Sequence, residues 1–175
     1  MAYTTIDKPS DYFETILYSG NGSTQSITSL DFQPDWCWLK ARAGANVSNH
    51  RSVDSVRGAT KELFQDATAA EETNTNGLTA FNSNGFSLGS SGGTNNSNTT
   101  YASWNWKAGG SASSNSNGTI TSSVSANTDA GFSIGTYNGS GSDNTVGHGL
   151  GVAPDMIIVK CKSTAHDWVV YHSAL

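Results

Sequence analysis

The chain has 175 residues and a formal net charge of −5, and its nine Lys and Arg residues are scattered, which excludes a phosphate-binding surface for nucleic acid. Gly, Ser, Thr and Asn make up nearly half of the residues, but five Trp, six Tyr and six Phe, with only 13% charged residues, exclude a disordered chain. No apolar run approaches the roughly 18 residues of a membrane span, and the N-terminus has no basic segment followed by an apolar one, so we expect neither membrane insertion nor a signal peptide.

The first part of the chain is predicted to form short strands joined by turns. Residues 1–11 are expected to form an N-terminal arm. Residues 12–20, YFETILYSG, alternate between apolar and polar side chains and lead into GNGS, a glycine-rich turn typical of hairpins. Residues 25–32, QSITSLDF, follow as a second strand with Ile27 and Leu30 as its expected anchors.

The next strand is predicted for residues 35–42, DWCWLKAR. Because successive side chains point to opposite faces of a strand, Trp36 and Trp38 share one face and Cys37 and Leu39 share the other. This alternation predicts a strand with two distinct faces.

The middle of the chain continues the pattern. Residues 51–58, RSVDSVRG, alternate again and predict a strand. Residues 59–72 are the only segment rich in helix formers, but they lack an apolar stripe, so we expect a long loop with one short helical turn. Residues 77–91 predict a hairpin with NSNG at its tip, and residues 99–110, TTYASWNWKAGG, predict a closing strand.

About seven short strands at this spacing predict an all-β fold, an antiparallel β-sandwich of about 100 residues. We expect tryptophans to supply the bulk of its core, because Ser and Gly bury little apolar area and each buried aromatic side chain contributes roughly 1.5–3 kcal/mol. These tryptophans are Trp36, Trp38, Trp104 and Trp106.

Part of the first half recurs roughly 120 residues later. Phe13 and YSGNGS match Phe132 and YNGSGS, FQPDWCWLK matches VAPDMIIVK, and RSVDSVR matches VVYHSAL. We interpret this recurrence as a duplicated domain. Residues 12–109 are the first sandwich, residues 110–118 a Ser/Gly/Asn linker, and residues 119–175 the start of a second, truncated copy.

The second copy has no counterpart of the strands between Leu78 and Trp106, so it cannot close the same core. An uncovered half-sandwich would leave strand edges unpaired, which folded proteins generally avoid. We therefore expect the natural chain to continue beyond Leu175, and the alternative is that a partner supplies the missing strands.

The acidic residues do not predict a catalytic pair. A glycan-cleaving sandwich would need two carboxylates about 5–10 Å apart, and no predicted strand carries acids at alternate positions. Most of the acids are expected in loops: Asp7, Asp11, Glu14, Glu62, Asp66, Glu71 and Glu72. We predict no catalytic residue and no enzymatic activity.

No metal or cofactor site is predicted either. The histidines have no metal-ligand spacing, and we expect them to be solvated or hydrogen-bonded: His50, His148, His166 and His172. The loop NGSGSDNTVG, residues 138–147, has ligands that calcium accepts, but it lacks the regular acidic spacing of an EF-hand, and turn formation explains it.

Two further patterns have structural explanations. Cys37 and Cys161 do not occupy matching positions, so we expect small core or strand residues and no disulfide. Asn-x-Ser/Thr arises from composition rather than as glycosylation sites: Asn21, Asn46, Asn98, Asn117 and Asn138. Exposed tryptophans could stack on sugar rings, but we favour a core role for them.

Several motifs together resemble a family of structural proteins from marine bacteriophages. They are YTTIDKPSDYFETILYSGNG, SITSLDFQPDWCWLKAR, DSVRGATKEL, GFSLGS, YASWNWKAGG, GTITSSVSAN, AGFSIGTYNGSG and VGHGLGVAPDMIIVK. Members of that family look like tandem lectin-type sandwiches related to the concanavalin-like jelly roll. They usually continue past YHSAL with a segment like GATK, from which this chain departs by ending at Leu175.

The resemblance implies a virion component made in the host cytoplasm, with tail fibre or tail tip favoured and capsid-surface decoration or head fibre as the alternative. The partners that it implies are other virion proteins and a host surface glycan, and a homo-oligomer such as a trimer is expected by analogy. The family has no established catalytic residues, so none is assigned here. A glycan-degrading enzyme on the same scaffold is the less favoured second class of function.

Overall fold

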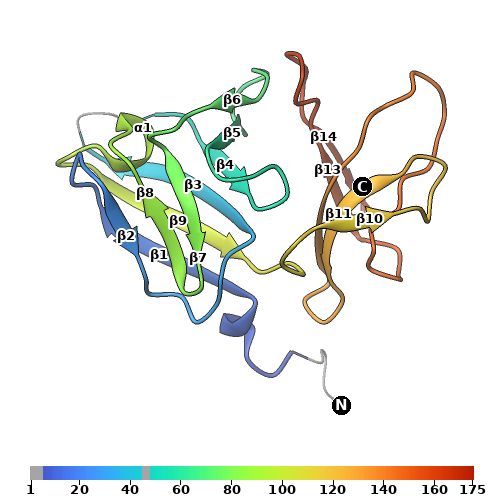
Figure 1. Cartoon of the computed structure of the whole chain (residues 1–175), viewed down its shortest axis with the longest axis horizontal. Helices are drawn as coiled ribbons and strands as arrows, with labels where there is room; N and C mark the ends of the chain where they lie inside the picture. Colours follow the sequence, from blue (N-terminus) through green and yellow to red (C-terminus); the bar gives the residue numbers. More distant parts are fainter. Residues whose placement is uncertain (1–5, 45–47) are drawn as a thin grey trace.

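Nearly all regular structure in the chain is β-strand, as predicted. The computed structural model describes residues 6–44 and 48–175, and strands account for about 41% and helices for about 4% of it. The antiparallel sheets form a β-sandwich-like arrangement (Figure 1). This composition of turn formers, β-branched residues and aromatics therefore folds as the sequence predicts.

A six-stranded sheet forms one layer of the first half. Its order is β1-β9-β3-β4-β5-β6, so β9 pairs with both β1 and β3. The closing strand thus lies second from one edge of the sheet, between β1 and β3. The bounds are β1 (Phe13–Ser19), β3 (Trp36–Ala43), β4 (Arg51–Asp54), β5 (Lys61–Phe64), β6 (Glu72–Thr73) and β9 (Thr100–Trp106).

The second layer is a three-stranded sheet of order β2-β8-β7, with β2 (Gln25–Ile27), β7 (Leu78–Asn82) and β8 (Gly85–Leu88). The predicted NSNG hairpin is the β7–β8 pair. The prediction that GNGS closes a hairpin is wrong, because β1 and β2 belong to different sheets. Gly20 donates its N–H to Thr99 O at 2.8 Å and Gly22 donates to Asn95 O at 2.8 Å, which turns the chain from one layer to the other.

The core lies between these two sheets. Its buried members are Tyr18, Cys37, Leu39, Ala41, Val53, Leu78, Phe86, Leu88 and Tyr101. Tyr18 and Tyr101 stack with their ring centroids 5.1 Å apart, and their hydroxyls donate to Thr94 O at 2.7 Å and to Gly92 O at 3.1 Å. Two tyrosines with satisfied hydroxyls therefore supply the bulk that the sequence assigned to tryptophan. The two predicted anchors also pack inward, Leu30 buried and Ile27 partly buried.

The four tryptophans of β3 and β9 lie on the opposite face of the six-stranded sheet and are only partly buried. Strand alternation is as predicted, but the face assigned to the core is wrong. Trp36 and Trp106 stack at 4.3 Å, and Phe132 from the second half stacks on Trp36 at 5.9 Å. Through Trp36 and Trp106, the tryptophan face therefore contacts the second half of the molecule.

The segment expected to be a loop with a helical turn, residues 59–72, contains β5 and the start of β6, while residues 65–71 between them form a loop as predicted and contain no helical turn. Pairing of β5 with β4 buries Leu63 and Phe64, and this tertiary contact overrides helix propensity. The helical turn of the first half is α1 (Gly92–Asn95), and Ser91 caps it by accepting a hydrogen bond from Gly93 N–H at 3.4 Å.

The second half contains a three-stranded sheet and a separate hairpin (Figure 1). The sheet comprises β10 (Ser113–Asn115), β11 (Ser122–Asn127) and β12 (Phe132–Thr136), and the hairpin comprises β13 (Met156–Val159) and β14 (Val169–His172). The segment predicted as a linker thus carries β10, which pairs with β11. A short 3-10 turn, η1 (Pro9–Asp11), precedes β1. Among the described residues, no helix has the length and apolarity of a membrane span.

Candidate functional site

The β13–β14 hairpin exposes an unusual amount of apolar surface. Six large apolar side chains on it are 43–63% exposed: Met156, Ile157, Ile158, Val169, Val170 and Tyr171. Because side chains alternate along each strand, these six lie on both faces of the hairpin. Within the described chain, both faces of the hairpin therefore leave apolar side chains about half exposed.

This hairpin has the same clasp as the β3–β4 hairpin of the first half. Asp35 accepts a hydrogen bond from Ser55 N–H on its carbonyl at 2.8 Å and another from Ser55 Oγ on Oδ1 at 2.9 Å. Asp155 accepts the same two bonds from Ser173, both at 2.8 Å. The local geometry at the two Pro-Asp motifs is therefore the same.

The register of the two hairpins matches as well. In each, the residue after the aspartate pairs with the residue before the serine: Trp36 with Asp54, and Met156 with His172. Ile157 and Tyr171 consequently occupy the positions of a pair in the first-half core, Cys37 and Val53.

The two hairpins differ in how much of their matching side chains is covered by a second sheet. Cys37 and Val53 are 0% exposed beneath the β2-β8-β7 sheet, whereas Ile157 and Tyr171 are 43% and 54% exposed. The hairpin thus presents a face of the core type over which no second sheet lies among residues 6–44 and 48–175.

Among the residues that the structure describes, one edge of β13 is also unpaired. The matching edge of β3 is occupied by β9, and three hydrogen bonds join Asp35 to β9 and the segment after it. Asp35 N–H donates to Trp106 O at 2.8 Å, and its Oδ2 accepts from Ala108 N–H at 2.8 Å and Gly110 N–H at 3.3 Å. Within the described chain, the N–H and Oδ2 of Asp155 have no such partners.

The loop between β13 and β14 holds the hairpin against the first half. His166 N–H donates to Thr68 O at 3.0 Å, and Lys162 O accepts from Glu71 N–H at 2.9 Å. Trp168 donates its indole N–H to Phe64 O at 2.8 Å. The hairpin is therefore fixed at its loop, close to the strands β5 and β6, while the strands themselves stay exposed (Figure 1).

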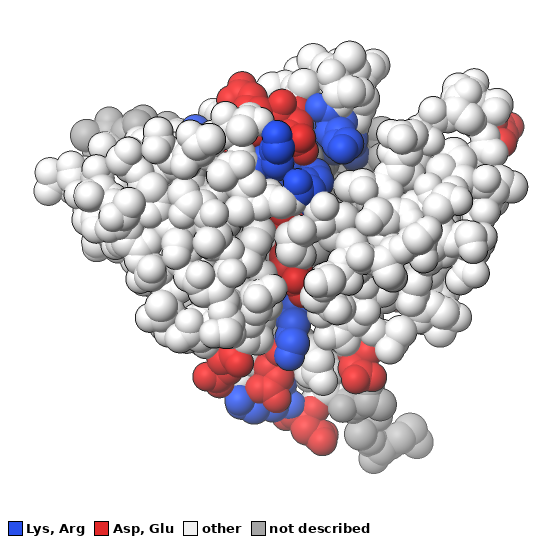
Figure 2. Space-filling view, in the orientation of Figure 1, with Lys and Arg blue, Asp and Glu red and all other residues white. Residues whose placement is uncertain are grey.

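A second surface feature is an open hollow of about 400 Å³ in the second half. Its lining is almost entirely hydroxyl and amide groups, with one lysine and one aromatic ring: Ser114, Thr121, Ser122, Ser123, Thr136, Tyr137, Asn138 and Lys162. Tyr137 is 42% exposed. Charged side chains gather along the line between the two halves and near the N-terminal segment, and the rest of the face in Figure 2 is nearly uncharged.

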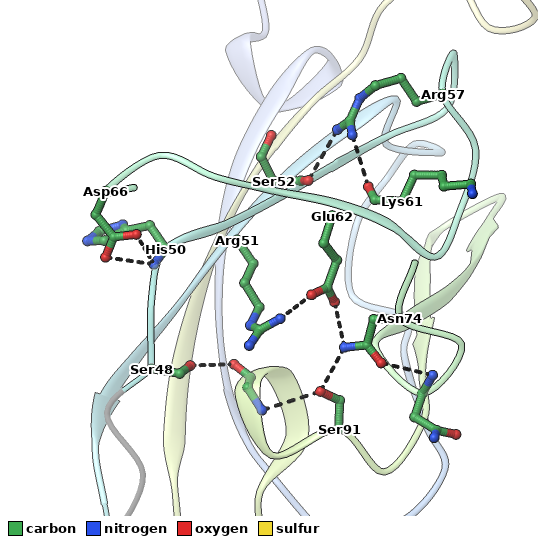
Figure 3. A network of polar contacts seen from close by, with 12 residues as sticks. Ser48, His50, Arg51, Ser52, Arg57, Lys61, Glu62, Asp66, Asn74 and Ser91 are labelled. Atoms are coloured by element: carbon green, nitrogen blue, oxygen red, sulfur yellow. Dashed lines mark hydrogen bonds and ion pairs between the residues drawn. The ribbon is translucent and has the colours of Figure 1, made fainter. Parts of the chain in front are cut away.

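A buried polar network links strands and the helical turn of the first half (Figure 3). Arg51 pairs with Glu62, which is fully buried, and Asn74 Nδ2 donates to Glu62 Oε1 and to Ser91 Oγ, each at 3.0 Å. A Cβ added at Gly93 would overlap the guanidinium of Arg51, so a larger residue there would displace the arginine from its place beside Glu62. The network joins β4 and β5 to α1, and both carboxylate oxygens of Glu62 are engaged.

Arg57 forms a second buried ion-pair cluster. Its guanidinium donates to Asp54 Oδ2 at 2.6 Å and to Glu71 Oε2 at 3.0 Å, and also to the carbonyls of Ser52 and Lys61 at 3.2 Å each. Glu62 and Glu71, which the sequence placed in loops among candidate acids, are therefore both paired with arginine. Glu62 lies in β5 rather than in a loop.

The remaining acids are dispersed. Asp66 accepts from His50 N–H at 3.2 Å, and Asp11 pairs with Lys8 at 2.7 Å. Glu14 lies in β1 and Glu72 in β6, while Asp7 is exposed. Among the described residues, no three His, Cys, Asp or Glu side chains gather as a metal site.

The histidines take separate roles. His50 accepts from the Trp38 indole at 2.9 Å on Nδ1, and burial and then Lys40 lower its pKa, against the opposing effect of Asp66. His148 and His172 accept backbone N–H groups two residues ahead, at 3.2 and 3.1 Å. His166 contributes its backbone to the loop contact described above.

Both cysteines are free. Cys37 is a core residue, as predicted, and burial raises the pKa of its thiol. Cys161 follows β13 rather than lying in a strand, and hydrogen bonds from Thr164 and Ser163 lower its pKa to about 6.

The Asn-rich loops bond mainly to themselves. Asn144 Nδ2 donates to Ser140 Oγ at 2.5 Å and to Ser142 O at 3.0 Å within the loop considered for calcium. Of the five Asn-x-Ser/Thr asparagines named above, four are exposed: Asn21, Asn98, Asn117 and Asn138. Asn46 lies outside the described residues, and a sixth match to the pattern, Asn95, is buried.

Comparison with known proteins identifies one family. The family model described as a domain of unknown function (DUF7483) matches residues 8–175, which include both halves and the hairpin. No curated protein and no solved structure matches the chain.

Proposed function

The chain belongs to the DUF7483 family, and we propose that it is a structural protein of a bacteriophage particle that joins other virion proteins. The observation that carries the proposal is the exposed β13–β14 hairpin. Burying one large apolar side chain contributes roughly 1.5–3 kcal/mol, so six of them on a narrow hairpin provide a strong drive for association. The placement in a phage particle is supported by the resemblance of the sequence motifs.

A tail-associated position, in a fibre or at the tail tip, is the favoured location, and capsid-surface decoration or a head fibre is the alternative. The hollow around Tyr137 supports a role in attachment. Hydroxyl and amide groups bond to sugar hydroxyls, and an exposed aromatic ring stacks on the apolar face of a sugar. Many weak contacts on a repeated array then add up to firm attachment.

The pairing of carboxylates with arginines favours a role in binding over a role in hydrolysis. Glu62 and Glu71 are each held by an arginine, so neither is placed as a free general acid. Polysaccharide incubated with the protein is expected to stay intact. Release of reducing ends would support the enzyme class instead.

The location is tested with antibodies against the chain on intact particles of the phage that encodes it, viewed by electron microscopy with gold label. Label on tails supports the favoured assignment, and label on heads supports the decoration alternative. Particles that carry no label at either place, from a lysate in which the chain is detected, overturn the virion role.

The attachment role is tested with the full chain on a printed glycan array. Tyr137→Ala is expected to weaken glycan binding roughly tenfold, or about 1.4 kcal/mol, because the exposed ring is lost. Tyr171→Ala is the matched control, since Tyr171 is also about half exposed but lies on the hairpin. Equal glycan binding by the wild-type chain and Tyr137→Ala would contradict the proposal that the hollow is the glycan-binding site.

A further inference from the structure

We propose that the free edge of β13 accepts an antiparallel partner strand of the β9 type, and this inference rests on the assembly role proposed above. A β9-type strand carries aromatic residues alternating with small or polar ones and continues into a short Ala/Gly turn, as in TTYASWNWKAGG. The partner is thus defined by its backbone geometry and side-chain pattern. Adding a strand to an exposed sheet edge is an established mode of recognition.

The first half provides the template. The β3–β4 and β13–β14 hairpins share their register and their Asp–Ser clasp. On β3, the edge opposite β4 is filled by β9, whose Trp106 lies opposite Trp36 and whose Asn105 lies opposite Cys37. The same edge of β13 has no strand on it within the described chain. An equivalent hairpin therefore presents an equivalent edge.

Asp155 specifies which strand fits. In the first half, all three bonds that Asp35 makes beyond its clasp come from β9 and the turn after it: a carbonyl from Trp106, and amides from Ala108 and Gly110. Asp155 keeps the clasp with Ser173 and leaves the matching N–H and Oδ2 open. A partner must therefore offer a carbonyl at its strand end and two amides two and four residues later.

The outer edge of β14 has no comparable groups that would select one kind of partner strand. On β4 the outer neighbour is β5, and that contact depends on the pairing of Arg51 with Glu62. The position of Arg51 is taken by Val169 in the register of β14. The apolar substitution removes the charge that would select a β5-type strand, so the specific edge is that of β13.

A second copy of this chain fits the edge less well. Pairing through its own β13 would require the segment after that strand to reach Asp155. That segment is already bonded to the first half through Lys162 and His166. Self-association is therefore an outcome for the experiment to detect rather than the proposed state.

The test uses the full chain and a synthetic peptide of residues 99–110 with a fluorescein label and a solubilising lysine tail. Saturable binding is expected by fluorescence anisotropy, with none for a scrambled peptide. Hydrogen exchange is expected to slow at Met156–Val159 on binding. Protection confined to β3 would instead mean that the peptide replaces the chain's own β9, and that result overturns the proposal.

Asp155→Ala is expected to weaken peptide binding about tenfold or more, because two charge-assisted hydrogen bonds are lost. Asp167→Ala, an exposed aspartate of the adjoining loop, is the matched control and should bind as the wild type does. Ser173→Ala removes the clasp and keeps Oδ2. It should bind better than Asp155→Ala, and equal weakening by the two variants would contradict the role given to Oδ2.

Two further results separate this proposal from the proposed function. Gold-labelled particles with no peptide binding would overturn the β9-type partner and leave the virion role standing. Unlabelled particles would overturn the virion role whatever the peptide does. Concentration-dependent self-association in light scattering, without peptide binding, would show that a second copy fills the edge and would overturn the partner proposed here.

Discussion

Glu62 is a fully buried carboxylate whose two oxygens are used by Arg51 and Asn74. A pair of this kind adds little to stability when it is intact, but removal of one member leaves a charge in the protein interior without compensation. The side chain of Arg51 is only 16% exposed, so water cannot replace the lost partner.

Glu62→Ala is therefore expected to lower the free energy of unfolding by about 3–5 kcal/mol, measured by denaturant titration. Glu72→Ala, at an exposed position in the neighbouring β6, is the control and should change it by less than about 0.5 kcal/mol. The apolar double substitution Arg51→Met with Glu62→Leu should cost less than Glu62→Ala. A cost for Glu62→Ala no larger than that of the control would contradict this account of the network.

Cys161 offers a prediction of pH dependence. The hydroxyls of Thr164 and Ser163 favour its thiolate and lower the pKa to about 6, while burial raises the pKa of Cys37. At pH 7 the folded protein should therefore be alkylated by iodoacetamide at Cys161 alone, and the rate should fall as the pH drops through about 6. Mass spectrometry identifies the modified residue.

Thr164→Val removes the first of these hydroxyls and should move the midpoint of the rate profile upward, towards the value of an ordinary thiol. Cys37 is the internal control, since it should react only after unfolding. A midpoint near 8.5 in the wild-type protein would contradict the role of the two hydroxyls.

The strands of the first half show what the sequence reveals about elements. The alternation of Trp36 and Trp38 with Cys37 and Leu39 follows from the period of a strand, and it was predicted. The inward face was not, because it depends on where the β2-β8-β7 sheet packs. That sheet is assembled from segments far apart in the chain, and the stacked tyrosines between the layers are not visible as a pattern.

The prediction for the segment between β4 and β7 was partly wrong for another reason. Residues 59–72 consist largely of helix formers, but the pairing of β5 with β4 and of Glu62 with Arg51 holds the backbone of Lys61–Phe64 extended. Local propensity contributes less than about 1 kcal/mol per residue, and tertiary contacts exceed it. The repeated Pro-Asp motif, in contrast, pointed correctly to a repeated strand entrance.

Only some features of the β13–β14 hairpin could be predicted from the sequence. Its strands and their likeness to the first copy could be inferred from VAPDMIIVK and VVYHSAL. The open N–H and Oδ2 of Asp155 could not, because the sequence shows what a residue is and not which neighbours reach it. The bonds made by Asp35 supplied that information.

At the scale of the molecule, the two halves meet through aromatic rings. Phe132 of β12 stacks on Trp36 and Trp106 at 5.9 and 6.3 Å, and hydrogen bonds at Trp168 and His166 add a second contact. The tryptophan face is therefore a joint between halves rather than a core.

Phe132→Ala is expected to lower the free energy of unfolding by about 1–2 kcal/mol, since the ring is partly buried and two stacking contacts are lost. Tryptophan fluorescence should shift to longer wavelength as water reaches Trp36 and Trp106. Tyr137→Ala, close by in sequence but without a ring contact, is the control. An unchanged emission spectrum for Phe132→Ala would contradict the aromatic joint.

The nearly uncharged face in Figure 2 has a consequence for behaviour in solution. Salt weakens attraction between charged groups by Debye screening, but it has little effect on hydrogen bonds from hydroxyls and amides or on ring stacking. Contacts made through the Ser- and Thr-lined hollow should therefore keep their strength from dilute buffer to ionic strengths near 1 M. Glycan attachment through this hollow would then be as strong in brine as in fresh water.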